Sequence, residues 1–342
     1  MSKKTKSILL ISICSSLILL LLIGSLVFTF SFNGEIPKTN ILYDKDDPDQ
    51  IIGSMPFPPS LQIPFGTDRD GNHMFYRILE GAQITLGVAL LISVLSFLFA
   101  FVFGILAGFS KSKSKYITQT LFTSFYFIPQ SIIAYNMLHP LLWEPYEGFT
   151  TTLTERILLQ IIILAGILAP TTAILISSET KQILQKDFIT STIILGGGKF
   201  YIFYKHLLPH LKLRLFIIFP KIVIQSLLII AHLSYFGLYF GGTDICYDDL
   251  LCDPPKPFIE EWASMIGMYY ADLHIYWWIF LGPMLFLTLT ILLLSGVSKG
   301  MEGLLDIKPI KHVKSSKVLN SSKKEQKASN LTKKDFGLVH RS

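Results

Sequence analysis

Six long apolar runs constrain the fold of this chain more than any other feature. A hydrocarbon core of about 30 Å requires roughly 20 residues of α-helix to cross it. Runs of about this length or longer lie near residues 8–30, 84–109, 116–142, 157–178, 222–240 and 274–297. Because lipid offers no partner to backbone N–H and C=O groups, each run is expected to be helical. The sequence therefore predicts an all-α polytopic membrane protein with six transmembrane helices.

The composition agrees with a membrane location. Hydrophobic residues make up 51% of the 342 residues and charged residues only 16%, which is too apolar for an ordinary soluble domain. Lys3, Lys4 and Lys6 precede the first apolar run, as basic residues do in a secretory signal. That run is too long for a signal and no small-x-small cleavage site follows it, so we interpret it as a retained anchor.

The distribution of lysine and arginine predicts which loops face the cytoplasm, because basic loops are retained there. With the amino terminus inside, the inner segments carry 24 basic and 6 acidic residues, and the outer segments carry 6 basic and 18 acidic residues. The inner segments are 1–7, 110–116, 179–221 and 298–342, and the outer segments are 31–83, 143–156 and 241–273. Both termini are thus predicted to be cytoplasmic. The net charge of +6 reflects this topology and not nucleic-acid binding.

The same pattern divides the chain into four predicted parts. Residues 1–30 form the cytoplasmic end and the first transmembrane helix, and residues 31–83 form an extended extracytoplasmic segment. Residues 84–308 form a five-helix core, and residues 309–342 form a basic tail of low complexity. The tail is predicted to be disordered, with attraction to anionic lipid headgroups and a purely solubilising role as its two options.

A basic loop interrupted by glycines, residues 186–214, lies between two of the apolar runs. It contains three consecutive glycines, Gly196 to Gly198, and Pro209. Glycine bends or breaks helices and proline ends them, so the loop is predicted to hold short amphipathic helices. Such helices can lie across the membrane face, where a cytosolic partner could dock.

The spacing within this loop is similar to a known pattern. From Thr190-Ser191-Thr192, three residues lead to Gly196, and nine more lead to His206, which opens a His-Leu-Leu-Pro sequence. This resembles the coupling loop of binding-protein-dependent ABC importer permeases, which touches the ATPase subunit. The loop is named for a Glu-Ala-Ala triplet, and this chain departs from it with Thr-Ser-Thr.

A second resemblance lies upstream. The segment Phe65 to Asn72, followed by Arg77 to Leu86, is similar to the GTDxxGRD and SRLxxGARxSL sequences of the dipeptide/oligopeptide subfamily. Asn72-His73 replaces the usual Arg-Asp. Further matches are Leu233 to Leu238 and Gly300 to Asp306, so the resemblance covers roughly residues 60–308.

The resemblance implies a transmembrane permease subunit of an ATP-driven importer in a bacterial plasma membrane, with peptides as the commonest substrate of the family. It also implies four kinds of partner: a second homologous permease, two ABC ATPase subunits, an extracytoplasmic substrate-binding protein and membrane lipid. No cofactor is expected on this chain, because ATP would be used by the partner subunits. The substrate stays open among oligopeptides, dipeptides, nickel complexes and other solutes.

The resemblance also assigns residues to the coupling loop. Gly196 is expected to bend the chain after a first short helix, and Leu208 and Pro209 to close a second. Phe188, Phe200 and Tyr201 are our own candidates for apolar docking contacts. The full set is Asp187, Phe188, Gly196, Gly197, Phe200, Tyr201, His206, Leu208 and Pro209.

The glycine run is not expected to bind ATP itself. A phosphate-binding loop requires a glycine where Ile193 stands and a serine or threonine where Phe200 stands. ATP hydrolysis is therefore expected in separate subunits. No zinc, heme or iron–sulfur spacing occurs, and the aspartates near residues 44–49 lack the spacing of a calcium loop.

Three polar residues within the apolar runs are candidates for the translocation path: Asn136, Gln225 and His232. Polar groups at membrane depth suggest function because lipid gives them no partner. The alternative is that they form hydrogen bonds between helices, which is common in helix packing.

Cys246 and Cys252 lie on an acidic outer loop and could form a disulfide on an oxidising face of the membrane. Two free thiols are the alternative, because spacing does not establish disulfide geometry.

Two other classes of function fit this sequence less well. An ATP-independent secondary transporter or channel would be expected to carry ionisable residues at mid-membrane, and here only His232 qualifies. A membrane-embedded enzyme would need paired carboxylates, metal-ligating histidines or a nucleophile and base within the helices, and the sequence shows no such arrangement.

Overall fold

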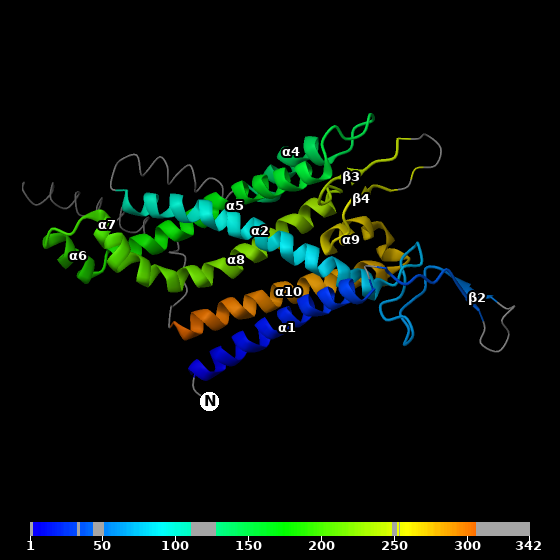
Figure 1. The fold of residues 1–342 in the computed structure, drawn as a ribbon, viewed down its shortest axis with the longest axis horizontal. Coiled ribbons are helices and arrows are strands. Elements are labelled where there is room, and N and C mark those ends of the chain that lie inside the picture. Colours follow the sequence, from blue (N-terminus) through cyan, green and yellow to red (C-terminus); the bar gives the residue numbers. More distant parts are fainter. Residues whose placement is uncertain are drawn as a thin grey trace, which may run out of the picture. The chain divides into compact units, whose positions relative to one another are not determined.

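A computed structural model describes residues 3–32, 35–43, 51–110, 128–247, 252 and 254–305. Within these ranges, five helices are long and apolar enough to cross a membrane (Figure 1). They comprise α1 (Lys3–Phe32), α2 (Met74–Phe109), α5 (Leu153–Leu184), the continuous helix that ends with α8 (Leu208–Tyr235), and α10 (Trp277–Leu304). The predicted all-α polytopic class is therefore confirmed.

The third apolar run, 116–142, is described only in its second part. That part forms α4 (Gln130–Leu142), and residues 116–127 lie outside the described ranges, as does the predicted tail 309–342. The count of six transmembrane helices therefore stays a prediction.

Several helices begin earlier than their apolar runs, among them α2 and α5. Helix α2 begins at Met74 and not near residue 84, because the polar side chains of its first turns find partners in the protein. Helix α5 begins at Leu153 behind a capping box, in which the Thr152 hydroxyl accepts from the Glu155 N–H and the Glu155 carboxylate accepts from the Thr152 N–H. Such reciprocal bonds satisfy backbone donors that the first helical turn leaves free.

Helices α2, α5 and α8 form the centre of the bundle, and α1 lies along α10 (Figure 1). Glycines permit the close approach of α2 to α5. A Cβ atom at Gly104 would lie 2.8 Å from the Cβ of Ile176, and one at Gly108 would overlap Thr180. These glycines are therefore helix-packing positions.

The predicted end of a short helix at Leu208 and Pro209 is wrong. Helix α7 (Lys199–Tyr201), a π-helical turn η1 (Ile202–Leu207) and α8 follow one another without a break. Pro209 stands in the first turn of α8, where a missing N–H costs little. The wider π turn precedes it, and the Leu208 N–H donates to the Phe203 carbonyl, five residues back. One helix thus runs from Lys199 to Tyr235.

Short elements lie between the long helices. The segment predicted to be merely extended contains the antiparallel pair β1 (Ile41–Tyr43) and β2 (Ile51–Ser54). After α8 come the antiparallel strands β3 (Thr243–Asp244) and β4 (Lys256–Pro257), then α9 (Trp262–Met268) and a 3-10 turn η2 (Tyr270–His274). Helix α6 (Asp187–Ile194) stands between α5 and α7.

Candidate functional site

The turn between α6 and α7 depends on one glycine. Gly196 has φ +85°, in the left-handed region that side chains disfavour. The Gly197 N–H donates to the Thr192 carbonyl at 2.9 Å and closes the turn against the end of α6. No atom would lie within 4 Å of a Cβ at Gly196, so its backbone angle alone calls for glycine. The structure thus places Gly196 at a bend after a short helix.

The inner face of α6 packs on the beginning of the long helix. Ile189 is fully buried there, and the Phe188 ring lies 5.3 Å from the ring of His210. The half-buried His206 lies 5.7 Å from the Tyr201 ring, with its Nε2 3.5 Å from the Thr192 hydroxyl. Phe188 and His206 therefore hold α6 in place, and Phe188 keeps 37% of its surface exposed.

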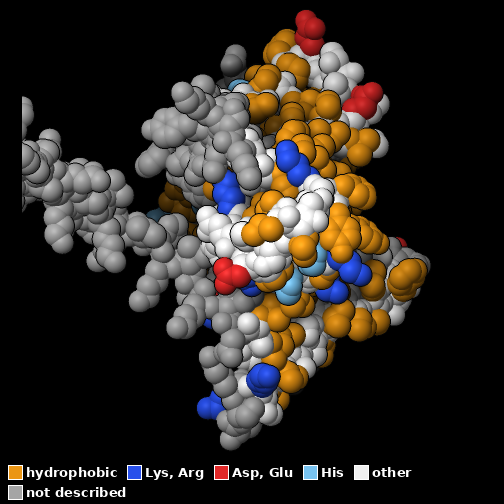
Figure 2. Space-filling model, turned by 90° about the vertical axis from the view of Figure 1, so that its left-hand side faces the viewer, with side chains coloured by type: hydrophobic (Ala, Val, Ile, Leu, Met, Phe, Trp, Pro, Cys, Tyr) orange, Lys and Arg blue, Asp and Glu red, His pale blue; other side chains and the backbone are white. Residues whose placement is uncertain are grey.

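The outer face of the same region is apolar and exposed. Phe200 is 81% exposed and Leu195 87% exposed, at the end where α6 and α7 lie (Figures 1 and 2). We define the α6–α7 apolar surface as Ile194, Leu195, Phe200, Tyr201 and Tyr204, all of them exposed. Phe200 and Tyr201 were predicted from the sequence. Ile194, Leu195 and Tyr204 were missed, although the Ile-Ile-Leu run before the glycines signals the first two.

Charged side chains surround this surface. Lys186, Lys199, Lys205 and Lys212 are all exposed, and Asp187 is exposed in the first turn of α6. Of the remaining predicted residues, Pro209 is exposed and Leu208 half-buried at the start of α8. Exposed apolar groups within a polar rim are typical of protein interaction sites.

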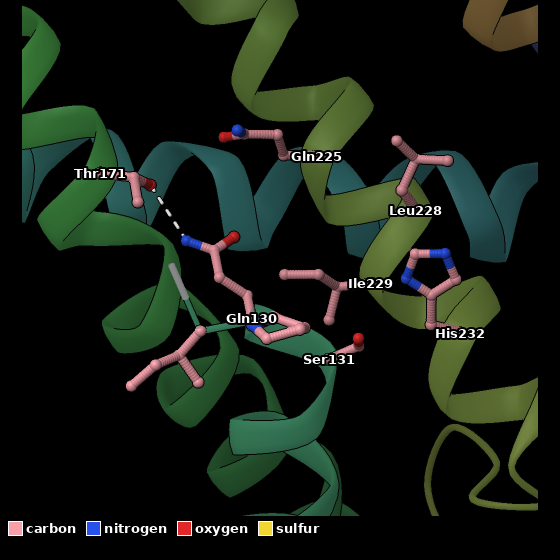
Figure 3. A pocket seen from close by; sticks show the side chains of 9 residues that line it. Gln130, Ser131, Thr171, Gln225, Leu228, Ile229 and His232 are labelled. Atoms are coloured by element: carbon pink, nitrogen blue, oxygen red, sulfur yellow. Dashed lines mark hydrogen bonds between the residues drawn. The ribbon is translucent and has the colours of Figure 1, made fainter. Parts of the chain in front are cut away.

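A second candidate site is a pocket of about 330 Å³ among α4, α5 and α8 (Figure 3). Gln225 and His232 of α8 both line it, so the structure brings together two of the three predicted path residues. Asn136 is not among the lining residues. It is exposed elsewhere on α4, and its Nδ2 donates to the Ile132 carbonyl of the same helix at 2.8 Å.

Sequence reasoning missed three polar residues of this pocket: Gln130, Ser131 and Thr171. The Gln130 Nε2 donates to the Thr171 hydroxyl at 3.1 Å and links α4 to α5 (Figure 3). Each is a polar residue in an otherwise apolar run, the same signal that identified Gln225. Ile128, Pro129, Leu228 and Ile229 complete the lining.

At the opposite end of the bundle from α6 and α7, a buried ionic network joins the start of α2 to α9. Arg77 pairs with Asp68 and Glu260, and its Nη1 donates to the Tyr269 hydroxyl at 2.7 Å. Burial raises the pKa of the Tyr269 hydroxyl. The Asp68 carboxylate also accepts from the Asn72 side chain at 2.8 Å, so this departure from the family motif is part of the network.

His73, the other departure, lies beside the network. Its Nε2 is 2.9 Å from the Thr39 hydroxyl, and partial burial lowers the pKa of its imidazole. Nearby, Glu261 caps α9 by accepting from the N–H groups of Ala263 and Ser264. Complete burial raises the pKa of the Glu261 carboxyl. The Glu261 carboxylate also accepts from the Thr85 hydroxyl of α2 at 3.1 Å, which joins α9 to α2.

The loop between α8 and α9 is held by Arg156 of α5. Its guanidinium lies 3.8 Å from the centre of the Phe149 ring, and its Nε donates to the Gly241 carbonyl at 2.8 Å. The structure joins Cys246 to Cys252 in a disulfide, with their Cα atoms 5.4 Å apart. Among the described residues, no group of three His, Cys, Asp or Glu side chains is placed to hold a metal ion.

Comparison with known proteins places this arrangement among transport proteins. A di/tripeptide transport system permease of Pseudomonas aeruginosa is 22% identical over 243 residues, which are 71% of each chain. A glutathione transport system permease of Pectobacterium atrosepticum is 23% identical over 250 residues, 73% of this chain and 74% of that protein. A dipeptide transport system permease of Bacillus subtilis is 23% identical over 260 residues, 76% of this chain and 73% of that protein.

A family model gives the broader assignment. The model described as "binding-protein-dependent transport system inner membrane component" matches residues 100–311, more than half of the chain. The matched range contains both the α6–α7 apolar surface and the pocket. The chain therefore belongs to the family of binding-protein-dependent transport system inner membrane components.

Proposed function

We propose that this chain is one of two permease subunits of an ATP-driven peptide importer in a bacterial plasma membrane, and that it forms half of the translocation path. Peptide is the proposed substrate because the three relatives are named for di/tripeptide, glutathione and dipeptide transport. The α6–α7 apolar surface is the observation that carries the coupling role. Its exposed side chains require a partner of matching apolar character.

The proposed partners follow from this arrangement. An ATPase subunit binds the α6–α7 apolar surface, and a second ATPase binds the equivalent surface of a second permease. An extracytoplasmic binding protein delivers peptide to the opposite end, near the disulfide loop. ATP is hydrolysed in the partner subunits, and both termini lie in the cytoplasm. The exposed lysines around α6 and α7 support this orientation through the retention of basic loops inside.

The long helix provides a physical route for coupling. It extends from Lys199, at the α6–α7 apolar surface, to Tyr235, beyond the pocket. Arg214 on this helix pairs with Glu179 of α5 and donates to Gln182 at 3.0 Å. A movement of the ATPases would therefore shift α8 and α5 together. Because the pocket lies between these helices, the shift would change access to it, as alternating access requires.

The structure decides how the coupling role is best tested. Removing residues 186–214 would also remove the first turns of the long helix, so point variants are preferable. We would purify the tagged protein from its native membrane with Phe200→Asp or Leu195→Asp and identify the copurifying proteins by mass spectrometry. The wild type should bring two P-loop ATPases and a second permease.

The variants should lose the ATPases and keep the second permease, because a charge replaces an apolar contact. Phe200→Leu is the matched control and should keep both. Retention of the ATPases by both aspartate variants would place coupling elsewhere. A wild-type protein that purifies alone and transports in liposomes without ATP would support the secondary-transporter alternative instead.

A further inference from the structure

Three polar side chains of the pocket have no hydrogen-bond partner among the described residues. The Gln225 amide, the Ser131 hydroxyl and the His232 imidazole all line the pocket. The structure gives these three side chains no hydrogen bond to another described residue. Gln130 uses its Nε2, and its Oε1 accepts no hydrogen bond from a described residue.

The pocket lies part-way along the bundle, where Gln225 and Ser131 are half-buried and His232 is exposed. Gln225 stands ten residues before the end of α8, which is about 15 Å along the helix. Thr171, on the facing helix α5, stands thirteen residues before the end of that helix, about 20 Å along it. At this level of the bundle, lipid offers an amide or hydroxyl no hydrogen-bond partner. A helix surface built only to face lipid would not place several such groups around one pocket.

We propose that this pocket is a subsite for the backbone of a passing peptide, recognised through neutral hydrogen bonds. The inference rests on the proposed function, because the peptide must enter the path that this subunit helps to form. The two glutamine amides and the imidazole each offer a donor and an acceptor, and so does the serine hydroxyl. A peptide bond presents one N–H and one C=O. These groups can form hydrogen bonds with both, whichever way the peptide chain runs.

The lining also indicates that the subsite does not distinguish peptides by the charge of their side chains. None of its nine residues is Asp, Glu, Lys or Arg. A pocket without fixed charge neither attracts nor repels charged peptide side chains, so peptides of different charge can pass. Ile128, Leu228 and Ile229 provide apolar surface beside the polar groups. At about 330 Å³, the pocket is at the lower end of the ~300–1,000 Å³ usual for ligand sites and suits a short stretch of peptide.

The test introduces a charge into the pocket and measures selectivity. The complete importer, with its binding protein, is reconstituted in liposomes, and ATP-dependent uptake of labelled Ala-Glu-Ala and Ala-Lys-Ala is measured as a ratio. Gln225→Glu should lower this ratio roughly fivefold, which corresponds to about 1 kcal/mol of charge repulsion. Because the binding protein is the same in every assay, a change in the uptake ratio must arise from the substitution in the pocket.

Asn136→Asp is the matched control, since it makes the same chemical change on α4 outside the pocket. It should leave the ratio unchanged. Gln225→Leu should lower the uptake of both peptides by a similar factor, roughly threefold to tenfold, because it removes one hydrogen-bonding group. A normal ratio in Gln225→Glu, with wild-type uptake, would overturn the subsite. A wild-type complex that imports neither these peptides nor trialanine would instead count against the proposed function.

A labelling experiment covers the case in which Gln225→Glu does not assemble. Ser131→Cys introduces a thiol into the pocket of a chain whose other described cysteines are buried or disulfide-bonded. Trialanine should slow the reaction of this thiol with a methanethiosulfonate reagent during turnover. Ser54→Cys, exposed on β2 outside the membrane-spanning helices, should react at the same rate with and without trialanine. An unprotected Ser131→Cys in an importer that transports trialanine would overturn the proposal.

Discussion

Arg77 shows how one buried charge can organise a large part of a membrane protein. Its side chain is 3% exposed and joins two carboxylates and a tyrosine from three different segments. An isolated cation at this position would pay a large desolvation cost, and the ion pairs offset it. The sequence showed Arg77 only as a motif position. Its partners Glu260 and Tyr269 lie more than 180 residues away, and no local pattern connects them.

Replacing Arg77 tests this network. Arg77→Leu should lower the free energy of unfolding by about 3–5 kcal/mol, because it leaves the fully buried Asp68 carboxylate without its counterion. The measurement is the unfolding midpoint of the purified protein in mild detergent. Lys221→Leu is the control, since it breaks a more exposed pair with Glu302 and should cost at most about 1 kcal/mol. Equal shifts in the two variants would contradict the role assigned to Arg77.

The α6–α7 region and the long helix that follows it show where local patterns succeed and fail at the level of elements. The glycine run predicted a bend, and Gly196 provides one with φ +85°. Pro209 predicted a helix end, and the chain continues through a π turn instead. A proline restricts only its own φ and its missing N–H, and both are tolerated in a first turn. Whether a helix continues beyond it is decided by the apolar residues that pack downstream, such as Leu211 and Leu215.

Two neighbouring glycines allow a matched test of this turn. Gly196→Val should reduce peptide uptake strongly, because a β-branched residue at positive φ forces the α6–α7 turn to change shape. Gly198→Val should have little effect, since Gly198 has φ −71° and open space around it. Uptake of labelled peptide by intact cells, with membrane insertion checked by immunoblot, provides the measurement. Similar uptake by the two variants would contradict the requirement for glycine at position 196 in the α6–α7 turn.

Membrane topology, meaning which end of the bundle faces the cytoplasm, is a property of the whole molecule. The basic α6–α7 region lies at one end of the bundle, and the disulfide loop lies at the other (Figure 1). The charge pattern predicts that the loop end faces the oxidising outer compartment. The two ends are joined by helices that span the bundle. If one end faces the cytoplasm, the other therefore faces the outer compartment.

Alkylation of intact cells tests the topology and the disulfide together. Without reductant, Cys246 and Cys252 should resist a membrane-impermeant maleimide, and both should react after an impermeant phosphine is added. Mass spectrometry of the peptides provides the measurement. Buried Cys14 of α1 should stay unlabelled in both conditions and acts as an internal control. Labelling of both loop cysteines without reductant would rule out the disulfide, and no labelling even after reduction would place the loop inside.

The sequence by itself determined the class of fold, five of the helices and the family resemblance. These depend on hydropathy and on motifs that are local in the chain, and lipid forces apolar runs to become helices. It also identified Gly196, Gln225 and His232 as positions of interest. Tertiary structure alone decided that Gln225 and His232 share one pocket with Gln130 and Ser131, and that Asn136 does not. The physical reason is that the rotation of one helix against another depends on packing, as at Gly104 and Gly108, and hydropathy does not encode this rotation.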